Sequence, residues 1–423
     1  MADRRARRSP SGGRSGRAAA ITGRQSATDA ALTAIFREET GRLTAALVRA
    51  LGDFDLAEEL VQEALLEAVE HWPKDGIPDK PGAWLLTTAR RKAVDLFRRQ
   101  ARFREKLALL EGASMRDDTA EGDDRLRLIF TCCHPALSRE AQVALTLRAV
   151  AGLTTTEIAR AFITSEATIA QRIVRAKRKI VDAKIPYRVP AERDMGERLA
   201  EVLAVLYLMF NEGYLATAGE RASRRDLAED AVWLAGLMVR LMPEEPEAMG
   251  LLALMRLHLA RADSRFDQQG NLVLLQDQDR SQWDQERIAA AMVVLQRAAA
   301  LQRAGPYQLQ AAIAACHAEA RSWQETDWRQ IVALYDVLLE LMPSPIVQLN
   351  RAIAHRYLNG AEAAMPEVDA LEGTLDDYYL FHATRAELLR DLGRDAEGRA
   401  ALARALELTA NPAERALLQR RLG

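Results

Sequence analysis

Apolar residues recur at helical spacing along almost the whole of this chain, and no segment is strand-rich. In the second half, helical units restart near Pro243, Pro306, Pro343, Asp377 and Pro412. The intervals are 63, 37, 34 and 35 residues, and the last three are close to the ~34-residue period of stacked helix pairs. The chain is therefore predicted to be all-α, with helical repeats in its second half.

The clearest repeat copy occupies residues 383–412. Gly393 stands at the predicted turn between two helices, and small residues such as Ala386 and Ala401 allow helices to approach closely. This pattern resembles tetratricopeptide (TPR) repeats, whose helix pairs bury their apolar faces only by stacking. The longest interval contains a non-helical insertion, residues 261–284.

The net charge of −2 conceals an asymmetry between the two halves of the chain. Residues 1–190 hold 33 Lys and Arg against 25 Asp and Glu, whereas residues 191–423 hold 25 against 35. A basic half suits a polyanion, because neutralised phosphates release condensed counterions and supply most non-specific nucleic-acid affinity. The acidic half is expected to avoid DNA.

Several classes of protein are disfavoured by the sequence. The longest apolar run, residues 202–210, is far shorter than the ~20 residues that cross a bilayer. Three cysteines, of which Cys132 and Cys133 are adjacent, make no disulfide framework, so we expect a cytoplasmic protein. Cys132, Cys133 and His134 are interpreted as packing residues. No motif of a known enzyme class is present, so we expect no catalytic site, cofactor or metal.

Residues 155–180 have the form of a helix-turn-helix, although Ile163 stands where the turn often has Gly. In the second helix Ile169, Ile173, Ala176 and Ile180 share one narrow face. The alternative is an amphipathic surface helix whose basic face is solvated. The side chains available to DNA on the opposite face and its flanks are Thr168, Gln171, Arg172, Arg175, Arg178 and Lys179.

A second basic segment, residues 83–103, combines arginines with aromatic residues, as single-stranded nucleic acid requires. Phe97, Phe103 and Trp84 are its candidate stacking platforms, and each aromatic is also a candidate core residue. The helices of this region are predicted to break at residues 51–53 and 72–82.

The helix before that segment, within residues 53–69, has an acidic face. Its predicted buried stripe consists of Leu56, Leu60, Val61, Ala64, Leu65 and Ala68. The outer face, which would repel DNA and is therefore solvated or bound to a basic protein, carries Asp55, Glu59, Gln62, Glu63 and Glu67.

Three ordered motifs together resemble a known family. D-x-A-E-E-L-V-Q-E at 55–63, A-W-L-L-x-x-A-R at 83–90 and V-D-L-F-R-R at 94–99 precede the helix-turn-helix. The series resembles bacterial sigma factors of the extracytoplasmic-function (ECF) class in the sigma-70 family. Residues 130–162 resemble the ECF subgroup with a long TPR-like C-terminal extension.

The resemblance implies a role for each surface. Asp55, Glu59, Gln62 and Glu63 would contact the clamp helices of the β′ subunit of core RNA polymerase, and the β flap is a further implied partner. The residues implied in binding melted −10 promoter DNA are Trp84, Arg90, Arg91, Asp95, Arg98, Arg99 and Arg102. Many ECF factors have Asn at the position of Arg91. The double-stranded −35 element would be bound by Thr168, Gln171, Arg172, Arg175, Arg178 and Lys179.

The predicted domain organisation has five parts. They are a disordered basic tail (1–28), a sigma-2-like domain (29–106), an acidic linker (107–124), a sigma-4-like helix-turn-helix domain (125–187) and a TPR-like extension (191–423).

The extension is hypothesised to regulate activity in cis, or to contact polymerase or an effector. Its one hydrophilic cluster, a possible binding site, contains Asp277, Asp279, Arg280 and Trp283. Two functions of other classes stay open. One is a helix-turn-helix regulator with a TPR scaffold that binds operators without core polymerase, and the other is a TPR interaction scaffold without promoter specificity.

Overall fold

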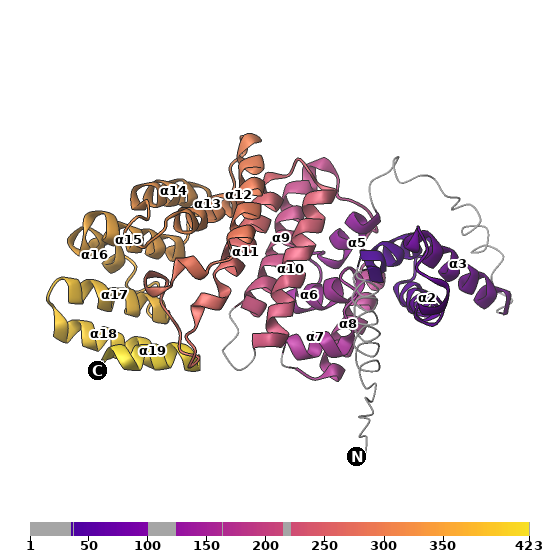
Figure 1. Ribbon diagram of the computed structural model, residues 1–423, viewed down its shortest axis with the longest axis horizontal. Helices are drawn as coiled ribbons and strands as arrows, with labels where there is room; N and C mark the ends of the chain where they lie inside the picture. The colour runs from indigo at the N-terminus through magenta and orange to yellow at the C-terminus, as the bar shows by residue number, and fades with distance from the viewer. Residues whose placement is uncertain (1–34, 37, 100–123, 163, 215–220, 423) are drawn as a thin grey trace, which may run out of the picture. The chain divides into compact units, whose positions relative to one another are not determined.

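A computed structural model describes residues 35–36, 38–99, 124–162, 164–214 and 221–422. Side chains of residues 98, 99 and 221–225 are outside this description. Within the described residues the regular elements are helices, and β pairing is limited to one isolated bridge between Phe266 and Leu272. The predicted all-α class is confirmed (Figure 1). The chain divides into two compact units, residues 1–159 with 164–198 and residues 160–163 with 199–423.

The first unit begins with a helix over residues 38–51, followed by α2 (Phe54–Asp75) and α3 (Pro81–Arg99). Gly52, at φ +67°, makes the first break. The side chain of Asp53 caps α2 by accepting hydrogen bonds from the backbone amides of Asp55 and Leu56. The break predicted within residues 72–82 is confirmed and is narrower than the stretch, because α2 continues through Pro73 to Asp75 and α3 begins at Pro81. Trp72 is only 3% exposed and its ring packs 5.4 Å from that of Trp84, which fixes the last turn.

Four helices follow in the first unit, α5 (Asp124–Cys132), α6 (Arg139–Ala149), α7 (Thr155–Ala161) and α8 (Glu166–Asp182). Ser138 and Ser165 cap α6 and α8 with their hydroxyl groups. Gly152 adopts a φ of +75° in the loop between α6 and α7, a conformation that favours glycine. Asp124, the last residue of the predicted linker, begins α5; the tail and the rest of the linker lie outside the described residues.

The remaining chain is also a succession of helices. Its elements are α9 (Glu192–Tyr214), α10 (Arg221–Leu241), α11 (Pro246–Ala260), α12 (Gln285–Ala300), α13 (Pro306–Glu319), α14 (Trp328–Leu341), α15 (Pro345–Asn359), α16 (Ala361–Asp369), α17 (Tyr379–Asp391), α18 (Asp395–Leu408) and α19 (Pro412–Leu422). The insertion between α11 and α12 holds the short 3-10 turns η2 (Ala262–Arg265), η3 (Leu275–Asp277) and η4 (Arg280–Gln282). From α13 onward each helix packs against the next one in sequence (Figure 1).

The predicted repeat starts fall at or just before every second helix, α11, α13, α15, α17 and α19. Proline occupies the first turn of α11, α13 and α15, where its missing N–H leaves no helical hydrogen bond unmade. Gly393, at φ +73°, joins α17 to α18 as the sequence predicts. One period of the sequence is therefore one helix pair.

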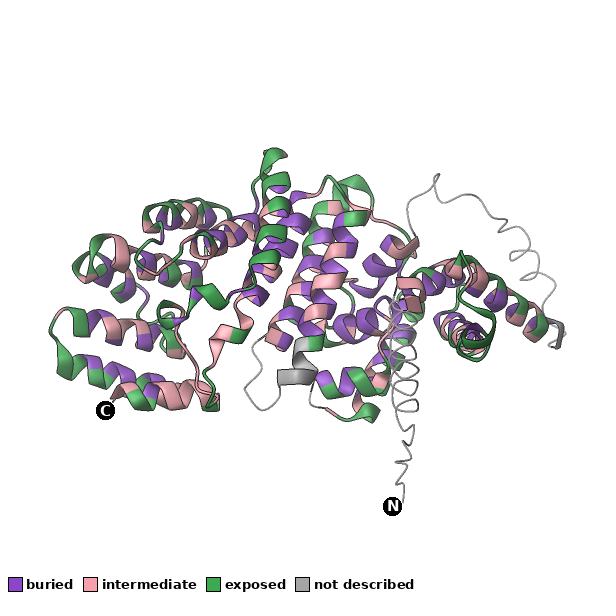
Figure 2. Cartoon of the chain, viewed as in Figure 1, coloured by how far each residue is buried: buried purple, intermediate pink, exposed green. Residues whose placement is uncertain are grey.

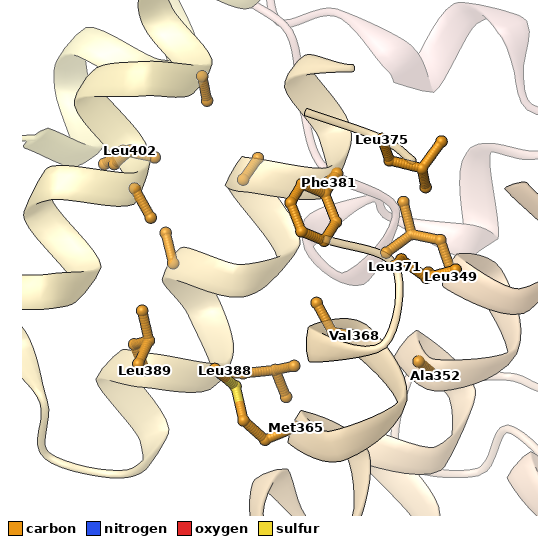
Figure 3. Close-up of a cluster of buried hydrophobic side chains, with 14 of the residues drawn as sticks. Leu349, Ala352, Met365, Val368, Leu371, Leu375, Phe381, Leu388, Leu389 and Leu402 are labelled. Carbon is orange, nitrogen blue, oxygen red and sulfur yellow. The ribbon is translucent and has the colours of Figure 1, made fainter. Parts of the chain in front are cut away.

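Most described helices of the second unit carry both buried and exposed residues (Figure 2), whereas α11 is buried along most of its length. A core cluster joins α15, α16, α17 and α18 through residues such as Leu349, Met365, Phe381 and Leu402 (Figure 3). Farther along the chain toward the N-terminus, α11 and α13 approach so closely at Gly250 that a Cβ there would lie 2.6 Å from the backbone nitrogen of Gln308. Only glycine fits at this crossing of the two helices, so Gly250 lets α11 and α13 pack closely together.

Candidate functional site

The second helix of the predicted helix-turn-helix, α8, has the two faces that the sequence indicates. Ile169, Ile173, Ala176 and Ile180 are all buried. The hydroxyl of Ser165 accepts a hydrogen bond from the amide of Thr168 at 3.1 Å and bonds its hydroxyl at 2.8 Å. The cap fixes where α8 begins. The packing of its buried face then determines which side chains face outward.

The outward face of α8 is basic. Gln171, Arg175, Arg178 and Lys179 are exposed, while Arg172 and Thr168 are half-buried. Arg178 lies 3.6 Å from Asp182 one turn later, and its side chain stays 83% exposed. Gln171, Arg175 and Lys179 are accessible to an anionic partner. Exposed Arg and Gln side chains on one helix can bind phosphates and the edges of bases in a major groove.

Lys177 is the residue of α8 that the sequence analysis missed. Its Nζ lies 2.7 Å from a carboxylate oxygen of Asp55 and 3.2 Å from one of Glu58, and its side chain is 10% exposed. Arg148 is also 3.4 Å from Glu58. The sequence did indicate that Lys177 is buried, because it follows Ile173 by four residues and so lies on the same face of the helix. Thus α8 is joined to the acidic helix α2 within the first unit.

The outer face of α2 carries acidic and apolar side chains together. Asp55, Glu59 and Gln62 are exposed and Glu63 is half-buried. The predicted stripe is buried except at Leu56 and Leu65, which are half-buried. On the same helix Leu66 is 64% and Val69 50% exposed.

A groove of about 320 Å³ lies beside these two side chains and is also lined by Gln62 and by Arg148. Exposed apolar residues within a charged rim are typical of a surface that binds another protein.

The basic residues of α3 are partly engaged by α2. Arg91 forms an ion pair with Glu67, and Lys92 lies 3.1 Å from Glu67 and 3.5 Å from Glu63. Burial alone raises the pKa of Glu67, but hydrogen bonds from Lys92 and Arg91 outweigh it and hold the pKa below its usual value. Arg90 is half-buried, and burial together with neighbouring Arg49 lowers its pKa.

The predicted single-strand surface is only partly visible. Trp84 is half-buried against Trp72, and Asp95 is exposed. Phe97 is only 2% exposed, so of its two predicted roles, stacking platform and core residue, the structure favours the core. The remaining residues of this surface, Arg98, Arg99, Arg102 and Phe103, lie outside the described side chains.

The cysteine pair is buried. Cys132 and Cys133 are 0% exposed, and the sulfur of Cys133 lies 3.5 Å from the hydroxyl of Thr146. Burial raises the pKa of the Cys132 thiol well above its usual value. Both thiols are therefore packing groups. Within the described ranges no group of three or more His, Cys, Asp or Glu could hold a metal ion.

The hydrophilic cluster of the extension separates into two kinds of residue. Arg280 is 7% exposed and donates to the carbonyls of His317 and Ala320, each at 2.9 Å, so it fixes the end of α13. Asp277 and Asp279 are exposed, and Asp279 caps η4. The fourth member, Trp283, is 4% exposed and lines a cavity.

Family models match three parts of the chain. Residues 35–103 match Sigma-70 region 2, residues 127–180 match Sigma-70, region 4, and residues 198–299 match a family of unknown function, DUF6596. The two sigma models cover the helices that carry the acidic face and the basic faces described above.

Curated relatives fall into two groups. An uncharacterized protein of Rhizobium meliloti, R00370, is 44% identical over 387 residues, which are 89% of this chain and 92% of that protein. The ECF RNA polymerase sigma factor SigK of Mycobacterium bovis is 32% identical over 170 residues, 38% of this chain and 90% of SigK.

A third relative, the ECF RNA polymerase sigma factor SigL of Mycobacterium tuberculosis, is 29% identical over 166 residues, 38% of this chain and 93% of SigL. No solved structure matches the chain. Within the described residues, no helix is both long enough and apolar enough to cross a membrane.

Proposed function

This chain belongs to the extracytoplasmic-function sigma factors of the sigma-70 family, and from this premise we propose that it joins core RNA polymerase in the bacterial cytoplasm and directs it to promoters. The observation that carries the proposal is the presence in one unit of two outward faces of opposite charge, acidic on α2 and basic on α8. A protein partner and a DNA partner require such different surfaces.

The polymerase contact is assigned to the face of α2 formed by Asp55, Glu59, Gln62 and Glu63. Glu59 and Gln62 are exposed, and Leu66 beside them offers the apolar area that a stable protein contact needs. Asp55 is already bound to Lys177. Clamp helices that bind Asp55 would therefore compete with Lys177 for its carboxylate, while Lys177 keeps Glu58 as a partner.

The promoter contacts are assigned to α8 and α3. On α8, Arg175 and Gln171 would read −35 base edges, while Arg178, Lys179, Arg172 and Thr168 position the helix on the backbone. On α3, Arg90, Arg91 and Trp84 would bind the melted −10 strand, for which the ion pair of Arg91 with Glu67 must open.

A regulator that binds operators without core polymerase is the second candidate. The ion pairs of Lys177 with Asp55 and Glu58 favour it, because they give part of the acidic face a partner inside the chain. These ion pairs give no partner to Glu59 and Gln62, which are both exposed, so the regulator function does not explain that part of the acidic face.

Transcription reconstituted from core polymerase, the full chain and a promoter library separates the two candidates. The sigma function predicts new start sites that appear only when the chain is added, at promoters sharing −10 and −35 elements. The regulator function predicts operator binding without core polymerase and no new start site.

We also propose that the helical extension controls this activity in cis. The opposite net charges of the two halves motivate the proposal. Truncation after Arg198 tests it and preserves the hydrogen bond from Arg198 to the carbonyl of Phe130. A truncated chain that supports transcription at the same rate, with unchanged regulation, contradicts control by the extension.

A further inference from the structure

The second unit contains a cavity of about 380 Å³ that none of the promoter or polymerase contacts uses. Its walls come from α9, α11, α13, α14 and α15, and the insertion between α11 and α12 contributes Leu275 and Trp283. This volume lies within the ~300–1,000 Å³ range of small-molecule sites, near its lower end. The cavity is therefore of a size for one small ligand.

Two residues of the cavity lining each hold a buried polar atom that lacks a hydrogen-bond partner among the described residues. They are Nε1 of Trp283 and Nδ1 of His317. Trp283 is 4% exposed, so its N–H is screened from bulk water. Buried donors are nearly always paired in native proteins, so an unpaired donor in a residue that lines a cavity is a place where a ligand can supply the acceptor.

The backbone places the polar groups of the lining near one another. The amide of Asp284 donates to the carbonyl of Ala260 at 2.9 Å, so Trp283, which precedes Asp284, and Arg261, which follows Ala260, flank one hydrogen-bonded pair. Arg280 links Trp283 to α13, because its guanidinium lies 5.4 Å from the Trp283 ring and donates to the carbonyl of His317. The insertion thus brings Trp283 against the ends of two helices.

The charge of the lining selects the sign of the ligand. Among the described residues that line the cavity, Arg261 alone carries a formal charge and none is Asp or Glu. Burial and the nearby Arg280 and Arg261 lower the pKa of His317 to about 4, so its ring is neutral at neutral pH. A cationic ligand has no counter-charge here, whereas an anion meets Arg261.

Most of the lining is apolar. Ile313, Leu338, Met342 and Val347 belong to the walls, and so does Ile346, a large apolar side chain that is 37% exposed. These side chains favour a hydrocarbon body that is removed from water. We propose that the cavity binds a small organic acid, whose carboxylate meets Arg261 and the Trp283 N–H and whose apolar body packs on α13 and α15.

Binding is measured on the full chain with the fluorescent sulfonate 8-anilinonaphthalene-1-sulfonate as the probe. Phenylacetate and hexanoate compete for the site, each compared with its neutral amide, phenylacetamide or hexanamide. The proposal predicts saturable binding of one probe per chain and displacement by the two acids at concentrations at least tenfold below those of the amides. Equal displacement by acids and amides, or no displacement by either acid, overturns it.

Three variants locate the site. Arg261→Gln is expected to weaken phenylacetate binding at least tenfold and to remove the preference for acid over amide. Trp283→Phe keeps the ring and removes the N–H, so acid affinity is expected to fall severalfold while the unfolding temperature stays the same or rises. Arg399→Gln, at an exposed arginine of α18 outside the lining, is the matched control and leaves binding unchanged.

A chain with Arg261→Gln that still prefers acids to amides shows that the anion binds elsewhere and overturns the assignment. Trp283→Phe that lowers the unfolding temperature without changing acid affinity contradicts a ligand role for the indole. These readouts measure binding alone, so they do not depend on polymerase or promoter function.

Discussion

Replacing Lys177 by Met tests the link between α8 and α2. Both carboxylates at its Nζ are lost as partners, but Asp55 is 81% exposed and its pair with Lys177 contributes at most about 1 kcal/mol. Glu58 is 15% exposed and keeps Arg148 as a partner at 3.4 Å. Losing the pair between Glu58 and Lys177 therefore costs about 1–2 kcal/mol, below the ~3–5 kcal/mol of a buried charge left with no partner. Met retains the apolar stem. The expected cost is about 2 kcal/mol.

Amide hydrogen exchange in the full chain measures that cost where it arises. A loss of about 2 kcal/mol raises the open population of α2 and α8 about 30-fold, so their protected amides are expected to exchange about 30-fold faster. Lys179→Met, at an exposed lysine of the same helix, is the matched control and leaves exchange unchanged.

A double-mutant cycle with Glu58→Gln completes the test. Lys177→Met and Glu58→Gln are expected to be coupled by about 1 kcal/mol, because each removes the other's partner. Unchanged exchange in α2 and α8 after Lys177→Met, or strictly additive effects of the two substitutions, would refute the reasoning.

Three further predictions concern other parts of the chain. Gly250→Ala is expected to destabilise the extension by about 1–3 kcal/mol, because its Cβ would meet the backbone of Gln308; thermal unfolding checks this, and an unchanged midpoint contradicts it. Burial lowers the pKa of His258 to about 3 and that of His317 to about 4, whereas a histidine in the unfolded chain has a pKa of ~6.5. As the pH falls below ~6.5, the unfolded chain therefore binds protons that the folded chain does not. Lowering the pH from 7 to 5 should cost the extension up to about 2 kcal/mol per histidine, and stability that stays flat in denaturant titrations argues against it. Arg175→Ala is expected to relax base preference at one −35 position by about 1–3 kcal/mol in a promoter-library binding assay, and a uniform loss over all sequences opposes that role.

The local periodicity of the sequence predicts the helices and the faces they bury. On α8 the apolar stripe of Ile169, Ile173 and Ile180 is confirmed, and the repeat starts coincide with alternate helices of the extension. Helical spacing and proline at the first turn depend on residues close in sequence, so they are visible without a fold.

Features that depend on distant residues were missed. The partners of Lys177 lie about 120 residues earlier in the chain, and the sequence could not decide between the core and the surface for Phe97, which is buried. Within the predicted break at 72–82, the exact end of α2 after Pro73 was also missed, where Trp72 packs on the distant Trp84. The cavity of the extension joins five helices and an irregular insertion. These outcomes follow from tertiary packing, which overrides local propensity.

The affinity of the full chain for core RNA polymerase tests the central proposal most directly. Glu59→Lys reverses a charge on the exposed face of α2, whereas Asp75→Lys reverses one on the same helix about 160° away around its axis. We predict tight binding that Glu59→Lys weakens at least about tenfold, or ~1.4 kcal/mol, and that Asp75→Lys leaves unchanged. No binding by the unmodified chain, or equal binding by the two variants, would contradict the account.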